Sequence, residues 1–213
     1  MQGVLLEAIQ DKVLHGTTTV GIRTGEGVVL CADMRASAGY FIANNNTMKI
    51  QRIDAHAGLT LAGGVADAQN IVDVLRYHAN MHRLRRGSPI PIRSLARLTS
   101  LLFHQNRGYP FIADILVGGY DSGPALYNID MFGSVESKQF VTTGSGSPVA
   151  YGVLEDECHN EMTMADAKRV ALTAVKAAIV RNIGTGDGIN IAVMDREGFR
   201  LLADEQKRAV IQL

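Results

Sequence analysis

The chain has 213 residues, enough for one domain with a sizeable core, and 46% of them are hydrophobic. Lysine plus arginine total 21 and aspartate plus glutamate total 21, so the zero net charge argues against nucleic acid or an anionic membrane surface as a partner. The two cysteines, Cys31 and Cys158, indicate neither a disulfide framework nor a metal knuckle. We therefore expect a reducing, cytoplasmic setting and no cofactor.

The N-terminal part of the chain predicts a short leader followed by strands. Residues 1–16 lack a basic start and carry Glu7 and Asp11 within their apolar stretch, so they are a poor signal peptide. They fit an exposed amphipathic segment, or a leader that is removed for another reason. Strand patterns then predict two pairs of strands, at 17–23, 27–33, 48–54 and 57–63.

Helical spacing replaces the strand pattern after residue 64. Apolar residues recur at this spacing over 65–86, and a second helix is predicted from Pro91 to about Arg107. Three further strands are predicted, at 111–120, 124–130 and 137–143.

The last third of the chain predicts two more helices and two more strands. Ser147 before Pro148 is typical of an N-cap and opens a short helix to about His159. Thr163 and Asp166 resemble a capping box at the start of a longer helix. The final strands are expected at 189–195 and 199–205. Helices outside strands that are buried on both faces predict an α/β (α+β) fold, a four-layer αββα sandwich.

The stretch HGTTTVGI indicates a site of chemistry at Thr17. If the bond after Gly16 were cut, Thr17 would hold both a hydroxyl nucleophile and a free α-amine. Such an amine has an ordinary pKa of about 7.7–8.0, so it can act as a general base for the hydroxyl. Threonine is also common in strands, and three in a row are explained as well by strand propensity alone.

Three further positions favour the catalytic interpretation. Asp33 ends the second predicted strand at the edge where Thr17 begins the first, and Lys49 begins the third. A buried lysine held by an aspartate would favour proton loss from a nearby hydroxyl, although an ordinary surface ion pair is the alternative. Gly63 lies between a strand and a helix, where a backbone N–H can stabilise an oxyanion or where glycine simply permits a tight turn.

Ordered motifs over the whole length resemble the β subunits of 20S proteasomes, of archaeal type. The matching segments are TTTVGI at 17–22, ADMRASAG at 32–39, MKI at 48–50, LAGGVADAQ at 61–69, ILVGGYD at 115–121, TTGSGSPVAYGVLE at 142–155 and GINIAVMD at 188–195. The resemblance implies the N-terminal-nucleophile hydrolase fold. It also implies that residues 1–16 are a propeptide removed by autolysis, and that residues 17–213 are the hydrolase domain.

The resemblance also implies a role for each site residue. Thr17 resembles the nucleophile and base, Lys49 the lysine that tunes it, and Asp33 the acidic partner of that lysine. Gly63 would supply the oxyanion-hole N–H, and Ser145 would hydrogen-bond the terminal amine. The positions that resemble the first specificity pocket carry no charge, which predicts cleavage after apolar residues; they are Ala36, Thr47, Gln51, Leu61, Val65 and Gln69.

One stretch departs from the family pattern. Active members carry a motif like RDxxSG after the last long helix, whereas this chain reads RNIGTG, with Asn182 for the aspartate and Thr185 for the serine. Losing a charged hydrogen-bond partner costs roughly 1.5–3 kcal/mol, which predicts slower autolysis and turnover. The alternatives are a silent structural β subunit in a mixed ring with an active type, and a bacterial two-subunit relative in the same superfamily.

As a member of this family, the chain would be a threonine endopeptidase that degrades unfolded polypeptides inside a closed chamber. The implied partners are other β subunits in a seven-membered ring, flanking rings of α subunits, and a regulatory ATPase that acts through the α ring. Two other signals predict nothing. His78 and His82 lack the HExxH glutamate of a zinc site, and the glycines at 184–188 follow a helix, the reverse of a dinucleotide-binding loop.

Overall fold

The computed structural model describes residues 16–204 and 206, apart from the side chains of residues 65, 66 and 68. Two five-stranded antiparallel sheets form its centre. In spatial order, the strands of the first sheet are β10 (Phe140–Thr143), β1 (Thr19–Arg23), β2 (Val28–Asp33), β11 (Ile189–Asp195) and β12 (Gly198–Leu201). Those of the second sheet are β5 (Ile50–Asp54), β6 (Ala57–Gly63), β7 (Ala113–Tyr120), β8 (Pro124–Ile129) and β9 (Val135–Ser137).

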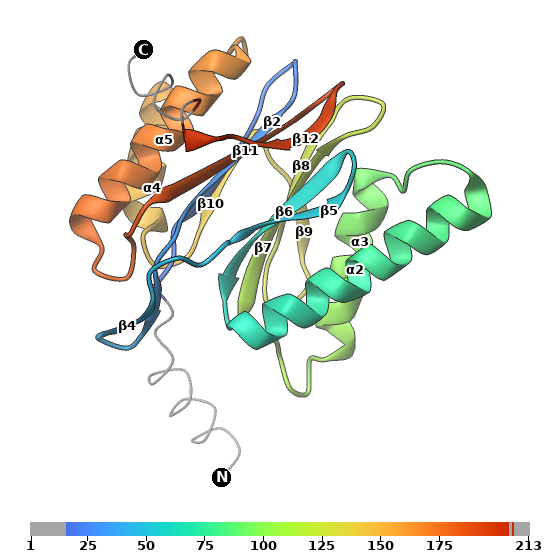
Figure 1. Cartoon of the computed structure of the whole chain (residues 1–213), viewed down its shortest axis with the longest axis horizontal. Helices are drawn as coiled ribbons and strands as arrows, with labels where there is room; N and C mark the ends of the chain where they lie inside the picture. Colours follow the sequence, from blue (N-terminus) through green and yellow to red (C-terminus); the bar gives the residue numbers. More distant parts are fainter. Residues whose placement is uncertain (1–15, 205, 207–213) are drawn as a thin grey trace.

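Four helices cover the outer faces of the two sheets (Figure 1). Helices α4 (Ser147–Glu157) and α5 (Met164–Arg181) pack on the first sheet, and α2 (Val65–Arg86) and α3 (Ile92–Gln105) pack on the second. The four layers confirm the predicted αββα sandwich. Each sheet is therefore buried on both faces, which explains why β2 reads as the continuous apolar run VVLCA before Asp33.

Three apolar clusters fill the spaces between the layers. One joins α4 and α5 to the first sheet, a second joins α2 and α3 to the second sheet, and a third lies between the sheets. In the third cluster Leu30 and Leu126 are fully buried. The sheets approach closely where Gly21 faces Leu126, because a Cβ added to Gly21 would lie 2.9 Å from a Leu126 methyl carbon.

The structure corrects several predicted elements. A hairpin of β3 (Ala36–Ala38) and β4 (Phe41–Asn44) was not predicted. The strand predicted at 137–143 is confirmed only from Phe140, where β10 begins, whereas Ser137 is the last residue of β9 in the other sheet. The strand predicted at 199–205 ends at Leu201, and residue 205 lies outside the described residues.

Of the two helix caps predicted from the sequence, the structure contains one. The capping box at α5 is confirmed: the Asp166 N–H donates to the Thr163 hydroxyl, and the Thr163 N–H donates to the Asp166 carboxylate. The predicted Ser147 cap is wrong, because Gly146 is the N-cap of α4 and Ser147 already belongs to the helix. The Ser147 hydroxyl donates instead to the Gly144 carbonyl.

Candidate active site

Thr17 lies just before the first residue of β1, with its peptide bond to Gly16 intact. The residue is 4% exposed, and its Oγ1 donates a hydrogen bond to the carbonyl oxygen of Gly16 over 2.7 Å. Its backbone N–H donates to the hydroxyl oxygen of Ser145 over 3.3 Å. The hydroxyl of Thr17 therefore lies beside the carbonyl group that it would have to attack for self-cleavage. Residues 1–15, the rest of the predicted propeptide, lie outside the described residues.

Asp33 and Lys49 form a buried ion pair next to the start of β1, where Asp33 accepts the Thr18 N–H. The Lys49 ammonium donates to Asp33 Oδ1 over 2.6 Å, and the two side chains are 4% and 0% exposed. The same carboxylate accepts backbone N–H groups from Thr18, Arg35 and Gly186. The alternative of an ordinary surface pair is therefore wrong. Four donors fix the aspartate, which in turn fixes the lysine.

Burial controls the protonation of Lys49. Removing the ammonium from water lowers the pKa of Lys49 below its ordinary value of 10.5, against the raising effect of the Asp33 carboxylate. The lysine therefore gives up its proton more readily than a lysine on the surface. While it is protonated, little water screens its charge from neighbouring groups.

Ser145, Asn182 and Thr185 form one hydrogen-bonded network next to Thr17. Asn182 Oδ1 accepts from the Ser145 hydroxyl, the Gly184 N–H and the Thr185 hydroxyl, each over 3.0 Å. Its Nδ2 donates to the Ser145 carbonyl oxygen over 3.1 Å. Thr185 also shares a hydrogen bond of 2.8 Å with the Thr18 hydroxyl. The two residues that depart from the family pattern are thus fully used as hydrogen-bond partners.

An ion pair that could not be predicted from the sequence holds the loop between α5 and β11 in place. Arg35, just after β2, pairs with Asp187 over 2.8 Å and also donates to the Ile183 carbonyl. Asp187 adopts φ of 64°, a left-handed conformation that is uncommon outside glycine but that aspartate adopts more often than most residues. The only sequence signal was the pair of glycines that flank Asp187.

Gly63 lies at the junction between β6 and α2, as predicted. Its φ is 127°, and an added Cβ would lie 2.0 Å from the Ile112 carbonyl oxygen, so glycine is required here for conformation and for space. Gly63 lines the same pocket as Thr17 and Lys49. The N-terminus of α2 directly follows, and its dipole favours negative charge at this end.

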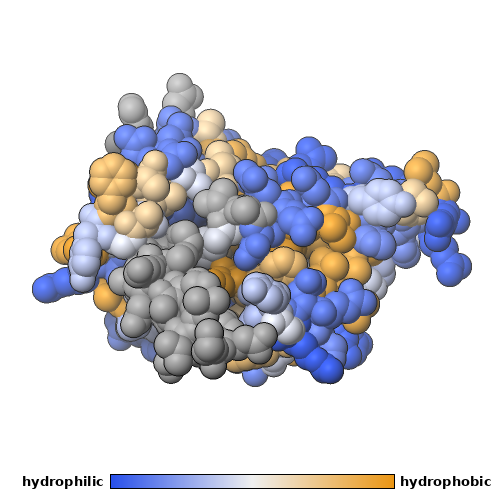
Figure 2. Space-filling view, turned by 90° about the horizontal axis from the view of Figure 1, so that it is seen from below, coloured by the Kyte–Doolittle hydropathy of each residue, from blue (hydrophilic) through white to orange (hydrophobic). Residues whose placement is uncertain are grey.

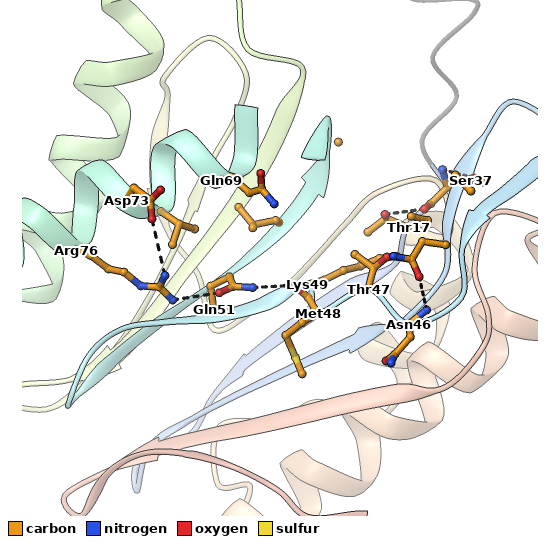
Figure 3. A pocket seen from close by; sticks show the side chains of 17 residues that line it. Thr17, Ser37, Asn46, Thr47, Met48, Lys49, Gln51, Gln69, Asp73 and Arg76 are labelled. Carbon is orange, nitrogen blue, oxygen red and sulfur yellow. Dashed lines mark hydrogen bonds and ion pairs between the residues drawn. The ribbon is translucent and has the colours of Figure 1, made fainter. Parts of the chain in front are cut away.

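A pocket of about 630 Å³ opens in front of Thr17 (Figure 3). Five predicted specificity positions line it, namely Ala36, Thr47, Gln51, Leu61 and Gln69. The sixth, Val65, begins α2, but its side chain lies outside the described residues. Figure 2 shows the molecule from below the view of Figure 1. On this face apolar surface lies near the centre, with hydrophilic side chains beside it.

The six predicted positions carry no charge, but charged residues outside that set also line the pocket. Asp73 and Arg76 come from α2 and line the part of the pocket away from Thr17 (Figure 3). Arg76 donates to Gln51 Oε1 over 3.1 Å and lies 3.9 Å from Asp73. Neither residue could be predicted from the sequence, because helical spacing indicates the buried face of α2 but not which of its other residues border a cavity.

The described residues contain neither a cluster suited to a metal ion nor a helix suited to span a membrane. Within 16–204 and 206, no three His, Cys, Asp or Glu side chains gather closely enough to hold a metal ion. His78 is exposed on α2 and forms an edge-to-face contact with Tyr77. Among the helices of the same residues, none is long and apolar enough to cross a membrane.

Comparison with known proteins points to one family. The family model described as "Proteasome subunit" matches residues 13–194. "Proteasome subunit beta 2" of Nitrosopumilus maritimus is 76% identical over 206 residues, which cover 96% of this chain and 98% of the relative. The protein of the same description from Cenarchaeum symbiosum is 77% identical with the same coverage. "Proteasome subunit beta" of Methanopyrus kandleri is 46% identical over 92% of this chain and 95% of its own.

Proposed function

Because the chain belongs to the proteasome family as a β subunit of archaeal type, we propose that it is a threonine endopeptidase with Thr17 as its nucleophile. One observation carries the proposal. The Thr17 hydroxyl lies 2.7 Å from the Gly16 carbonyl oxygen, and Thr17 lines one pocket with Lys49, which forms a buried ion pair with Asp33. A hydroxyl needs such support, since its own pKa keeps it protonated near neutral pH.

Self-cleavage would create the active residue. Thr17 Oγ1 adds to the carbonyl carbon of Gly16, a C–O ester bond forms as the C–N bond breaks, and the hydroxyl proton passes to the nitrogen. Water then hydrolyses the ester. The products are residues 1–16, ending in the Gly16 carboxylate, and a Thr17 with a free hydroxyl and a free amine.

Turnover would repeat this chemistry on other peptide bonds. The freed amine takes the hydroxyl proton and passes it to the leaving amine of the substrate. The Lys49 cation would favour the deprotonated oxygen, and the Gly63 N–H, just before the start of α2, would stabilise the oxyanion. Ser145 holds the amine, to which it is already hydrogen-bonded as the Thr17 N–H.

The family suggests a setting for this activity. We propose that residues 1–16 are the propeptide and 17–213 the hydrolase domain, which assembles into seven-membered β rings between rings of α subunits. Unfolded polypeptides would reach the enclosed site in the cytoplasm through the α ring, with the help of a regulatory ATPase. The substrate preference would be for apolar residues next to the cleaved bond, with Asp73 and Arg76 bordering the far part of the pocket.

The test is Thr17→Ala in the full-length chain, assembled with α subunits. We expect particles of normal size that keep residues 1–16 and hydrolyse no peptide, as read by intact mass and a fluorogenic peptide assay. Thr99→Ala is the matched control, because Thr99 is a buried threonine of α3 that is distant in sequence and lies outside the pocket. A Thr17→Ala particle that still turns over peptide would contradict the proposal.

Asn182 raises a second candidate function, a structural β subunit without activity in a mixed ring with an active type. In that case wild-type particles would keep residues 1–16 after assembly, and Thr17 would never gain its free amine. The hydrogen bonds of Asn182 favour the active subunit, because Asn182 Oδ1 accepts from the Ser145 and Thr185 hydroxyls as a carboxylate oxygen would.

A further inference from the structure

We propose that Ser37 positions the Gly16–Thr17 peptide bond for self-cleavage, by accepting a hydrogen bond from the N–H of Gly16. The inference rests on the proposed function and deepens it, because it concerns the step that frees the Thr17 amine. The Gly16 N–H donates to the Ser37 hydroxyl oxygen over 2.7 Å in a buried contact. Ser37 lies within the matching segment ADMRASAG at 32–39, but the resemblance assigned it no role, and the hairpin that carries it was not predicted.

The local backbone turns Ser37 toward the site. Ser37 is the middle residue of β3 and is buried, whereas Ala38 beside it is exposed. The pairing of β3 with β4 changes register between Ala36 and Ser37. Such irregularities re-aim a side chain, and this one presents the hydroxyl to the pocket end at which Thr17 lies (Figure 3).

A second contact leaves Gly16 little room to move. A Cβ added to Gly16 would lie 2.1 Å from the Cα of Gly184, and one added to Gly184 would lie 2.4 Å from the Cα of Gly16. The backbones of the residue before the bond and of the loop after α5 are therefore in direct contact. Glycine at both positions is what permits this approach.

Three groups thus hold the peptide unit before the reaction. Ser37 binds the nitrogen of Gly16, Gly184 borders its Cα, and the Thr17 hydroxyl binds its carbonyl oxygen. Attack by Thr17 Oγ1 depends on the direction from which it meets the carbonyl carbon, so fixing the peptide from the nitrogen side raises the rate. The Ser37 hydroxyl keeps its proton and forms no covalent bond, which makes Ser37 a positioning residue.

A purely structural role would also explain this hydrogen bond, because buried N–H groups are almost always paired. The two roles differ in what they affect. A structural hydrogen bond supports the folded chain wherever it lies, whereas a positioning one changes the rate of self-cleavage in particles that are already folded and assembled.

The experiment follows residues 1–16 in full-length chains assembled with α subunits. Wild type, Ser37→Ala, Ser37→Thr and Ser100→Ala are compared by intact mass against time, using only particles of full size, and by melting temperature. Ser100→Ala is the matched control, since the Ser100 hydroxyl also donates to a backbone group, the Gly133 carbonyl, but on α3 and outside the pocket.

We expect Ser37→Ala to slow the loss of residues 1–16 by about three- to tenfold, the factor that one neutral hydrogen bond is worth. Ser37→Thr, which keeps a hydroxyl, should restore the rate, and Ser100→Ala should process at the wild-type rate whatever its melting temperature. Processing of Ser37→Ala at the wild-type rate would overturn the role of Ser37 alone. A wild-type particle that never loses residues 1–16 would instead overturn the proposed function.

Discussion

Asn182 forms hydrogen bonds through both the oxygen and the nitrogen of its side-chain amide. Its replacement of the aspartate of the family pattern is therefore more than the loss of a charge. Three donors converge on Oδ1, and Nδ2 donates to the Ser145 carbonyl oxygen. An aspartate here would keep the acceptor and gain a negative charge, but it would lose the donated hydrogen bond. The cost expected from the missing charge is thus offset in part by a contact that only the amide can make.

We therefore expect Asn182→Leu to slow self-cleavage and peptide turnover by about tenfold to a hundredfold, because three donors lose their acceptor. Asn182→Asp is the matched variant that keeps the acceptor, and it should stay within about tenfold of the wild type. The measurements are the mass of the subunit in assembled particles and its peptidase rate. Equal rates for Asn182→Leu and the wild type would show that the network around Ser145 has no part in the chemistry.

The lowered pKa of Lys49 predicts a particular pH profile for the processed enzyme. Activity should rise as the free Thr17 amine loses its proton, at an ordinary pKa of about 7.7–8.0. On the alkaline side activity should fall again, and this fall should begin before pH 10.5. There Lys49 loses the charge that favours the deprotonated hydroxyl. The measurement is kcat/KM against pH for a short apolar peptide, and a profile that stays level up to pH 10.5 would contradict it.

The alkaline fall should not come from unfolding through Lys49. The unfolded chain holds this proton to a higher pH than the folded chain, so between the two pKa values the unfolded state binds more protons. The contribution of Lys49 to stability therefore rises with pH across this window. Circular dichroism at each pH separates the two effects, because the fold should remain while kcat/KM falls.

At the scale of the elements, the sequence predicted the long helices and the central strands well. Thr17 and Asp33 could be brought together from sequence because β1 and β2 form a hairpin, with Thr19 opposite Ala32. Lys49 precedes β5 in the other sheet, so only the motif spacing of the family could add it to the site. The hairpin of β3 and β4 could not, since ASAGYFIAN lacks a regular alternation and β4 is exposed throughout. Ser37 was missed for that reason.

The capping box at the start of α5 should contribute measurably to stability. Thr163→Ala removes the side-chain acceptor for the Asp166 N–H, so we expect a loss of about 1 kcal/mol in the free energy of unfolding. Thr163→Ser keeps the hydroxyl and should unfold close to the wild type. Urea unfolding of the purified chain, carrying Thr17→Ala so that every molecule keeps residues 1–16, measures the difference. An unchanged midpoint in Thr163→Ala would mean that packing alone fixes this helix end.

At the scale of the whole molecule, the four layers determine where the site can lie. A charge in the middle of a strand that is buried on both faces would be costly, so Asp33 and Lys49 lie where β2 ends and β5 is about to begin. The order of layers could be predicted from apolar runs and helical spacing. The division of 135–143 between two sheets, with β9 in one and β10 in the other, could not be predicted, because both short segments show the same strand character.

The close approach of the two sheets leads to the last prediction. Gly21 of β1 faces Leu126 of β8, and a methyl group added at Gly21 would meet the Leu126 side chain at 2.9 Å. We expect Gly21→Ala to destabilise the chain by about 1–3 kcal/mol through overpacking. Leu126→Ala should cost about 2–5 kcal/mol, because it leaves a cavity in a fully buried position.

The double variant tests whether these two residues really meet. The methyl group of Gly21→Ala would occupy space that Leu126→Ala vacates, so the double variant should lose less than the sum of the single losses, by about 0.5–3 kcal/mol. Urea unfolding of the four chains in the Thr17→Ala background gives this coupling energy. Because positions that do not touch add independently, strictly additive losses would mean that the two sheets are further apart at this point than the structure has them.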